Sequence, residues 1–207
     1  LDGEVDRGAV SRLRAVIYFA DLRGFSALAE QLPGEEVVAM LDDYLDCLAR
    51  PVVDRGGEVL KFLGDGVLCV FEIGPDEPHF ACYVGLGAAR EALRRIDALN
   101  AERRARGAPV MQAGIALHLG DVLYGNVGIE GRLDFTVIGP AVNEAARLEA
   151  ECRELDRPLL VSEDFHAAAD HCRDALVSLG RRQLRGITRR QEVYTLMPEL
   201  FEEADAD

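Results

Sequence analysis

The chain has 207 residues, of which 49% are hydrophobic and 29% charged. This composition fits one folded domain and excludes a wholly disordered protein. With 23 basic and 37 acidic residues, the net charge is -14. That balance argues against nucleic acid or an anionic membrane as a partner, because no excess of positive charge exists to displace counterions. An anionic small substrate would need a metal ion or a few placed cations.

The five cysteines are odd in number and have no CxxC spacing, so we expect free thiols in a reducing compartment rather than disulfides or a zinc site. No apolar run approaches the ~20 residues of a membrane span, so we expect no membrane contact by this segment. No signal segment opens the chain, and we expect a cytoplasmic location. The first residue is Leu1, which suggests a longer protein with an N-terminal regulatory region.

Strand and helix patterns alternate along the first part of the chain. Residues 15–20 form an apolar run rich in strand formers, which predicts a buried strand. This strand runs into a turn over 21–26. A helix is then predicted from Pro33 until Arg55-Gly56-Gly57 stops it, because apolar residues recur there at three- and four-residue spacing.

A hairpin and a long helix are predicted next. Two strand-like runs, 58–63 and 67–71, flank Gly64-Asp65-Gly66. An Asp-Gly pair between two strand patterns is a strong hairpin signal. After a linker at 76–78, a long helix is predicted over about 79–106.

The second half is predicted to hold several further strands. A strand pair, 110–119 and 122–127, is expected to turn at Gly120-Asp121, and a polar loop is expected over 128–133. The remaining elements, in chain order, are a strand at 134–138, a helix from Pro140 to about 154, a strand at 159–161, a helix capped by Ser162, and closing strands at 176–184 and 192–197.

Hairpins mixed with crossover helices predict an α+β fold, with a mostly antiparallel sheet flanked by helices, rather than a doubly wound parallel sheet. We expect residues 1–14 to be a linker from a longer protein and 15–198 to be the folded domain. Residues 199–207 are expected to be an acidic tail.

Two aspartates are the first candidates for chemistry. Asp21 ends the first apolar strand and Asp65 lies at the tip of the first hairpin. If these strands are neighbours, both carboxylates project from one end of the sheet and repel each other unless a cation separates them. A hard divalent ion takes oxygen ligands and would fit. The alternative is that Asp65 is only a turn residue and Asp21 a cap.

The turn after Asp21 is a candidate phosphate site. Gly24 lets the backbone turn tightly, and Ser26 can cap a helix. Backbone N–H groups at a strand-to-helix turn can cradle a phosphate. One glycine is a weak signal alone, and the Walker pattern is absent.

Asn143 and Arg147 are four residues apart on a predicted helix, so they share one face. Facing a site, Asn143 could orient a ribose and Arg147 could neutralise developing phosphate charge. The alternative is an ordinary solvated helix face. Inside an apolar strand pattern, His118 is interpreted as a core or rim histidine rather than a ligand.

These pieces occur together, in order, in one protein family. The chain strongly resembles the catalytic domain of class III nucleotide cyclases, the adenylyl and guanylyl cyclases. The segments that carry the resemblance are IYFADLRGFSALAE (17–30), GGEVLKFLGDGVLCVF (56–71), GIALHLGDVLYGNVG (114–128) and LDFTVIGPAVNEAARLE (133–149). The match runs from about residue 15 to 149 and more loosely to 197.

The resemblance implies a ferredoxin-like core similar to polymerase palms. By position, it implies that Asp21 and Asp65, with the Leu22 carbonyl, hold two Mg²⁺ or Mn²⁺ ions per site. The turn residues that would lie under the triphosphate are Gly24, Phe25 and Ser26. The implied reaction converts ATP to 3′,5′-cyclic AMP and pyrophosphate by in-line attack of the ribose 3′-hydroxyl.

The resemblance also implies an antiparallel homodimer with two active sites shared across its interface. Asn143 would contact the ribose and Arg147 would stabilise the transition state, both from the other subunit. A monomer should then be inactive.

Two positions carry base choice in the family, and here they are Lys61 and Thr136. This Lys/Thr pair resembles a bacterial adenylyl cyclase subgroup. Lys61 can donate to adenine N1 while the Thr136 hydroxyl accepts from N6. Guanine, with an O6 acceptor and an N1 donor, is served poorly by Lys61, so we expect ATP rather than GTP.

Two positions depart from the family pattern. Asp121 stands where mammalian-like members often have a basic residue, and many members have a triphosphate-binding Lys near Thr188. Arg185, Arg189 or Arg190 could replace that Lys, or the basic run could balance nearby carboxylates.

The sequence therefore predicts an adenylate cyclase catalytic domain, and two alternatives stay open. One is a guanylate cyclase or dual-specificity enzyme, and Lys61 argues against it. The other is a catalytically silent cyclase-like regulatory module. The joint presence of Asp21, Asp65, Asn143 and Arg147 stands against silence.

Overall fold

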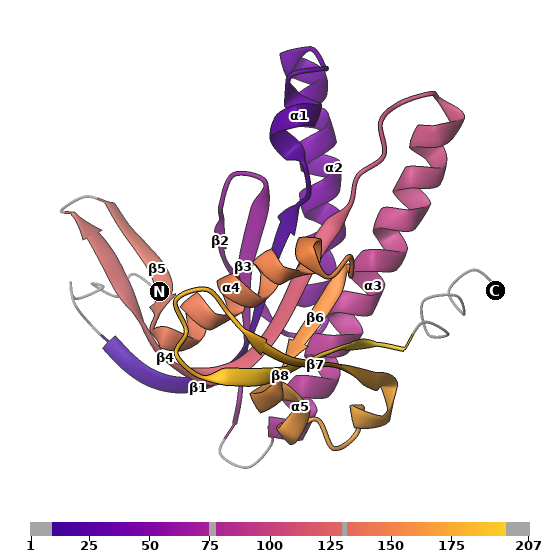
Figure 1. Ribbon diagram of the computed structural model, residues 1–207. Coiled ribbons are helices and arrows are strands. Elements are labelled where there is room, and N and C mark those ends of the chain that lie inside the picture. Colours follow the sequence, from indigo (N-terminus) through magenta and orange to yellow (C-terminus); the bar gives the residue numbers. More distant parts are fainter. Residues whose placement is uncertain (1–9, 75–77, 130–131, 198–207) are drawn as a thin grey trace.

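A computed structural model describes residues 10–74, 78–129 and 132–197. One sheet is covered on one face by α2 (Gly34–Val53) and α3 (Pro78–Ala105), and on the other by α4 (Pro140–Glu154) (Figure 1). The predicted α+β class, with a mostly antiparallel sheet flanked by helices, is confirmed. None of the described helices is both long and apolar enough to cross a membrane.

The sheet follows the order β2-β3-β1-β4-β6-β8-β7, and β5 pairs with β4. The strands are β1 (Val10–Leu22), β2 (Glu58–Phe62), β3 (Gly66–Glu72), β4 (Ala113–Ile129), β5 (Arg132–Ile138), β6 (Leu159–Ser162), β7 (Leu176–Gln183) and β8 (Arg190–Leu196). The short helices are α1 (Phe25–Ala29), α5 (Glu163–Ala168) and a 3-10 turn at Arg173–Ala175. Only the β4–β6 pair is parallel among the described strand pairs.

Helices on both faces explain why the middle of β1 is continuously apolar. Val16 and Tyr18 pack in the core beneath α2 and α3, whereas Ala15 and Ile17 pack beneath α4. Because side chains alternate along a strand, the same period places Asp21 on the α4 face. The alternation of β1 therefore fixes which helix can reach Asp21.

The predicted hairpin at Gly120-Asp121 is wrong, because β4 runs straight through both residues and pairs there with β1. The reason for a glycine at this point is packing rather than a turn. A Cβ on Gly120 would lie 2.5 Å from the Cβ of Ala141 on α4. The predicted loop over 128–133 is also too long, because the β4–β5 ladder continues to Ile129 and Arg132.

Helix α4 lies flat on β4 because the strand presents small residues to it. Ala116 packs against Leu148 and Cys152, and Gly114 and Gly120 have no side chain to hold the helix away. The inward residues of α4, all buried at helical spacing, are Ala141, Ala145, Leu148 and Cys152. The predicted start at Pro140 and end at Glu154 are confirmed.

Ser162 caps α5 as predicted, since its Oγ accepts a hydrogen bond of 3.2 Å from the Phe165 N–H. Ser26 does not cap a helix: α1 begins at Phe25 with Gly24 as its N-cap. Gly24 takes that place because its backbone is left-handed, with φ of 73°.

All five cysteines are free thiols, as predicted. Strand β1 begins at Val10, earlier than the predicted 15. The rest of the predicted N-terminal linker and the acidic tail lie outside the described residues.

We predict that Gly120→Ala destabilises the chain by about 1–3 kcal/mol, because the added methyl would overlap Ala141 and lift α4 from β4. Gly34→Ala is the matched control, since a Cβ there meets nothing within 4 Å. Thermal unfolding of both variants checks this. Equal melting temperatures for the two would contradict the packing argument.

Candidate active site

Asp21 and Asp65 meet at one edge of the sheet, as the sequence predicted. Strand β1 pairs with β3 so that Asp21 lies opposite Gly66, the residue after Asp65. The Leu22 N–H donates a 3.2 Å hydrogen bond to the Asp65 carbonyl, which ties the hairpin tip to the end of β1. The two carboxylates therefore come from neighbouring backbone segments.

The backbone around Asp21 is held firmly. Its carbonyl accepts a 2.8 Å hydrogen bond from the Tyr44 hydroxyl, and its Oδ1 accepts one of 3.0 Å from the Leu22 N–H. Gly66 and Gly114 are its register partners on the two adjacent strands. A Cβ on Gly66 would lie 3.0 Å from Asp21 Oδ1. Because neither glycine has a side chain, the Asp21 carboxylate can lie close to the backbone of β3.

A third carboxylate, Glu149 of α4, lies at the same edge and was missed by the sequence analysis. A Cβ on Gly114 would overlap its Oε1, which places Glu149 over the strand position next to Asp21. Helical spacing could have placed Glu149 on the flank of α4, beside the residues that the helix buries. The sequence alone did not show that these buried residues pack on β4.

Charge repulsion and burial act together in this group. Burial, and then the nearby Asp65 carboxylate, raise the pKa of Asp21 to about 6. Burial, and then Asp21, raise the pKa of Glu149 to about 7, while Arg23 opposes the shift. Half-buried acids in this state favour a bound cation.

The donor set fits a hard divalent ion. Its side-chain donors are all carboxylate oxygens, which suit Mg²⁺ or Mn²⁺. A Cβ on Gly66 or Gly114 would crowd Asp21 Oδ1 or Glu149 Oε1, so glycine at both positions lets these carboxylates lie over the strands. Leu22, the last residue of β1, lies next to Asp21, and its carbonyl as a further ligand stays a prediction.

The turn that follows Asp21 is anchored to the end of α4 by Arg23. The guanidinium donates a 2.8 Å hydrogen bond to the Cys152 carbonyl and another to the Arg157 carbonyl. It also lies 3.8 Å from the Asp156 carboxylate. Gly24 and Ser26 are exposed beyond it, as a phosphate-facing turn requires.

Asn143 and Arg147 are exposed on α4 and do not join Asp21 and Asp65 within one chain. At 100° per residue, Asn143 lies opposite the stripe that α4 buries on the sheet, and Arg147 lies well away from it. Their shared outward face is confirmed. Any site that uses them together with the two aspartates requires another copy of the chain.

Lys61 and Thr136 lie on two strands that are linked nearby. Lys61 is exposed on β2, and Thr136 is half-buried on β5 opposite Gly125. The Tyr124 hydroxyl of β4 donates a 3.0 Å hydrogen bond to Glu58 of β2. No hydrogen bond joins Lys61 to Thr136 themselves, and their pairing stays a prediction.

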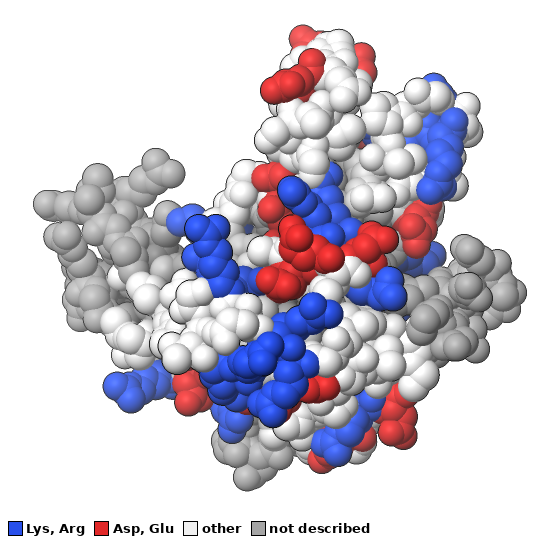
Figure 2. All heavy atoms as spheres, in the orientation of Figure 1, with Lys and Arg blue, Asp and Glu red and all other residues white. Residues whose placement is uncertain are grey.

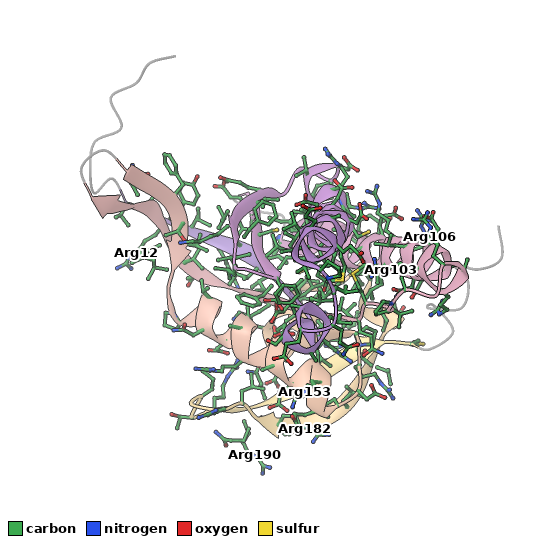
Figure 3. The ribbon with its side chains drawn as sticks, turned by 90° about the horizontal axis from the view of Figure 1, so that it is seen from above. Arg12, Arg103, Arg106, Arg153, Arg182 and Arg190 are labelled. Carbon is green, nitrogen blue, oxygen red and sulfur yellow. The ribbon has the colours of Figure 1, made fainter. Side chains whose placement is uncertain are left out.

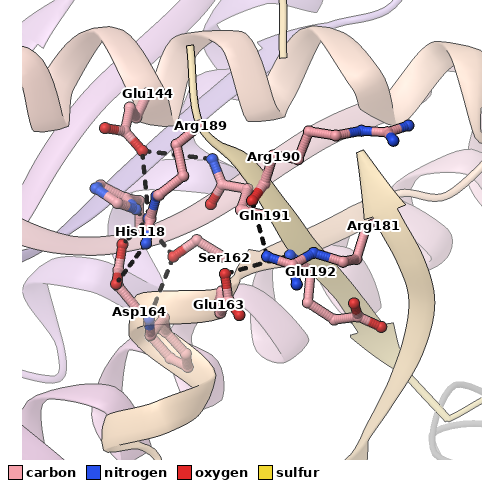
Figure 4. A network of polar contacts seen from close by, with 11 residues as sticks. His118, Glu144, Ser162, Glu163, Asp164, Arg181, Arg189, Arg190, Gln191 and Glu192 are labelled. Carbon is pink, nitrogen blue, oxygen red and sulfur yellow. Dashed lines mark hydrogen bonds and ion pairs between the residues drawn. The ribbon is translucent and has the colours of Figure 1, made fainter. Parts of the chain in front are cut away.

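His118 is buried, as interpreted from the sequence, but it has charged neighbours that the sequence did not reveal (Figure 4). Its Nδ1 lies 2.9 Å from Ser162 Oγ. Ligand atoms of His118, Glu144 and Asp164 lie within 4.8 Å of one another, so the three could hold a metal ion. The Arg189 guanidinium already lies 2.5 Å from Asp164 and 3.9 Å from Glu144.

Arg189 is therefore engaged within its own chain, and balances carboxylates as one reading of the basic run predicted. Among the described residues, Arg185 and Arg190 form no ion pair. Figure 3 shows Arg190 on the outer side of the β7–β8 hairpin, turned away from the helices. In Figure 2, acidic side chains gather in the middle of one face with basic ones around them.

The comparisons with known proteins decide the family. The sequence pattern of the adenylate and guanylate cyclase catalytic domain matches residues 11–198. The chain belongs to this family. An adenylate cyclase of Anabaena cylindrica is 33% identical over 163 residues, covering 77% of this chain and 31% of that protein. Adenylate cyclase 1 of Rhizobium meliloti is 29% identical over 194 residues, covering 91% of this chain and 28% of that protein. The chain spans about a third of the length of these relatives.

Solved cyclase structures share the fold, which confirms the palm-type core. A bacterial light-regulated adenylyl cyclase superposes with a TM-score of 0.77 at 30% identity, covering 91% of this chain and 53% of that one. The guanylyl cyclase Cya2 superposes with a TM-score of 0.76 at 26% identity, covering 91% of this chain and 95% of that one. The adenylyl cyclase CyaB of P. aeruginosa superposes with a TM-score of 0.81 at 24% identity, covering 91% of this chain and 96% of that one.

We predict that Arg189→Gln raises the pKa of the His118 imidazole. Burial lowers this pKa, Glu144 and Asp164 raise it, and Arg189 lowers it, so removal of the guanidinium leaves the carboxylates unopposed. NMR titration of the imidazole measures the change, and Arg190→Gln is the control. An unchanged or lower pKa in Arg189→Gln would show that the guanidinium does not act on His118.

Proposed function

We propose that this chain is the catalytic domain of an adenylate cyclase, which converts ATP to 3′,5′-cyclic AMP and pyrophosphate. The observation that carries the proposal is the meeting of Asp21 and Asp65 at one sheet edge in a chain of the cyclase family. The Anabaena cylindrica relative, an adenylate cyclase at 33% identity, supports the choice of reaction.

Asp21 and Asp65, with the Leu22 carbonyl, would hold two Mg²⁺ or Mn²⁺ ions. Such ions, when bound, activate the ribose 3′-hydroxyl and neutralise charge on the α-phosphate. The turn from Gly24 to Ser26, which includes Phe25, follows Asp21 at the end of β1 and would support the triphosphate. The 3′-oxygen then bonds to the α-phosphorus as the bond to pyrophosphate breaks in line.

A homodimer would complete two shared sites. Asn143 and Arg147 project from the face of α4 that is turned away from their own sheet, so we assign them to the site of the partner subunit. There Asn143 would orient the ribose, and Arg147 would meet the charge that develops in the transition state. Because Arg189 is engaged, Arg185 or Arg190 would contact the pyrophosphate.

Lys61 and Thr136 would select adenine. Lys61 donates to N1 and the Thr136 hydroxyl accepts from N6. The β2–β3 register shifts between Val59 and Lys61, and a bulge of this kind can re-aim a side chain toward a ligand. The likeness to the guanylyl cyclase Cya2 at 26% identity keeps GTP as the second candidate.

Turnover of ATP and GTP, measured separately at high protein concentration with Mn²⁺ and then Mg²⁺, tests the proposal. We expect cyclic AMP, no product from Asp65→Ala, and a larger fall in kcat than rise in KM for Arg147→Ala. Lys61→Glu should lose its preference for ATP. Unfolding curves show whether each variant is folded.

Three results would count against these assignments. Cyclic GMP as the main product would favour the second candidate. An intact kcat in Arg147→Ala would remove that residue from the transition state. If the chain is shown to be a dimer but turns over neither nucleotide, the proposed enzyme activity is wrong and a silent regulatory module is favoured.

A further inference from the structure

A group of possible metal ligands lies on the α4 side of the sheet, away from Asp21. His118 is four residues beyond Gly114, the register partner of Asp21, which is roughly 13 Å along β4. Ligand atoms of His118, Glu144 and Asp164 all lie within 4.8 Å of one another. They come from β4, α4 and α5, so the fold brings three separate elements to one point (Figure 4).

His118 is held in the manner of a metal-binding imidazole. Its side chain is buried, and its Nδ1 lies 2.9 Å from Ser162 Oγ, which also accepts a hydrogen bond from the Phe165 N–H. When Nδ1 carries the ring proton, Ser162 Oγ accepts that N–H, and Nε2 keeps a lone pair. Among the described residues, Nε2 has no hydrogen bond. A hydrogen bond at the other ring nitrogen commonly orients histidines that bind metals.

Gln191 is a second sign that this group lacks a partner. Its side chain is fully buried, and its Nε2 donates a 3.4 Å hydrogen bond to Glu144. Its Oε1 is buried with no hydrogen-bond partner in the described part of the chain. Such an unpaired oxygen is costly. Turning the amide over would bring Oε1 to the Glu144 carboxylate, and two oxygens stay together there only if a cation lies between them.

Arg189 supplies positive charge to the group but satisfies it only in part. Its guanidinium lies 2.5 Å from the Asp164 carboxylate but 3.9 Å from that of Glu144, which is beyond hydrogen-bond range. The Arg189 side chain is 49% exposed, so it can leave the group for solvent. A divalent ion would bring two charges to this position. It would also use the imidazole lone pair, which a bound guanidinium leaves without a partner here.

A cavity of about 610 Å³ lies beside the group. It is lined by His118, Glu144 and Asp164, together with Arg14 and Asp121 among others. Its charged lining residues are three carboxylates and one guanidinium, a balance that favours cations. A metal ion can therefore reach all three ligands through this cavity.

We propose that His118, Glu144 and Asp164 bind Zn²⁺, and that the ion takes the place of the Arg189 guanidinium. One imidazole nitrogen with carboxylate oxygens suits zinc, whereas Mg²⁺ prefers oxygen donors alone. Water in the cavity would supply the fourth ligand of a tetrahedral site. The site is distinct from the proposed catalytic metal site and does not depend on the proposed function. It revises the interpretation of His118 from the sequence, where its charged neighbours could not be seen.

NMR of the histidine rings during addition of Zn²⁺ tests this inference, at about pH 8, where an imidazole of ordinary pKa is neutral. The chain has four histidines, and His118→Gln identifies the signals of interest. We expect Zn²⁺ to shift the His118 signals, and Glu144→Gln or Asp164→Asn to weaken that binding about tenfold or more. Glu154→Gln, exposed on the same helix as Glu144, is the matched control and should bind zinc as the unsubstituted chain does.

Arg189→Gln tests whether the ion and the guanidinium compete. Without the guanidinium, zinc should bind about two- to fivefold more tightly, which is the size expected for loss of one partly exposed ion pair. Arg190→Gln, at the next and exposed position, should leave the affinity unchanged. Equal or weaker binding by Arg189→Gln would show that zinc does not replace the guanidinium.

Two further results would overturn the site itself. Zinc bound only by the free thiols would leave the His118 signals unchanged. Equal zinc affinity in Glu144→Gln, Asp164→Asn and the unsubstituted chain would remove both carboxylates from the ligand set. Thermal unfolding without zinc shows that each variant is folded, and no step of the test requires cyclase activity.

Discussion

The close approach of α4 to β4 is the constraint on which the rest of the site depends. Two strand residues without side chains, Gly114 and Gly120, let the helix lie directly on the sheet. That contact sets the rotation of α4, and the rotation decides where each polar side chain points. Glu149 lies over Gly114, beside the end of β1, and Asn143 and Arg147 face outward. Packing in the core therefore sets the geometry of the chemistry.

Electrostatics explains why an acidic chain can serve an anionic nucleotide. The carboxylates of Asp21 and Asp65 lie at one sheet edge with Glu149 beside them, and burial raises the pKa of Asp21 and Glu149. The group fits divalent cations, whose charge would reverse the local field before a triphosphate arrives. Glu144 and Asp164 differ, because the guanidinium of Arg189 in the same chain balances their charge.

The elements of the fold could largely be predicted from the sequence because their signals are local. Asp-Gly at Asp65 marks a true hairpin, and Pro140 starts a helix as expected. Gly120-Asp121 also resembles a turn signal but lies inside a strand. A glycine is needed there because Ala141 of α4 packs against it. The position of Glu149 near Asp21 could not be predicted for the same reason. Its neighbours are set by tertiary packing, which local periodicity does not encode.

The central claim is that each site combines the aspartates of one chain with α4 of another. Asp65→Ala should be inactive alone, and Arg147→Ala should turn over only slowly. Unfolded together and refolded as a mixture, they should regain about a quarter of full turnover, because half the dimers would be mixed and each would hold one intact site. Mixed dimers that form but make no cyclic AMP would contradict the shared site.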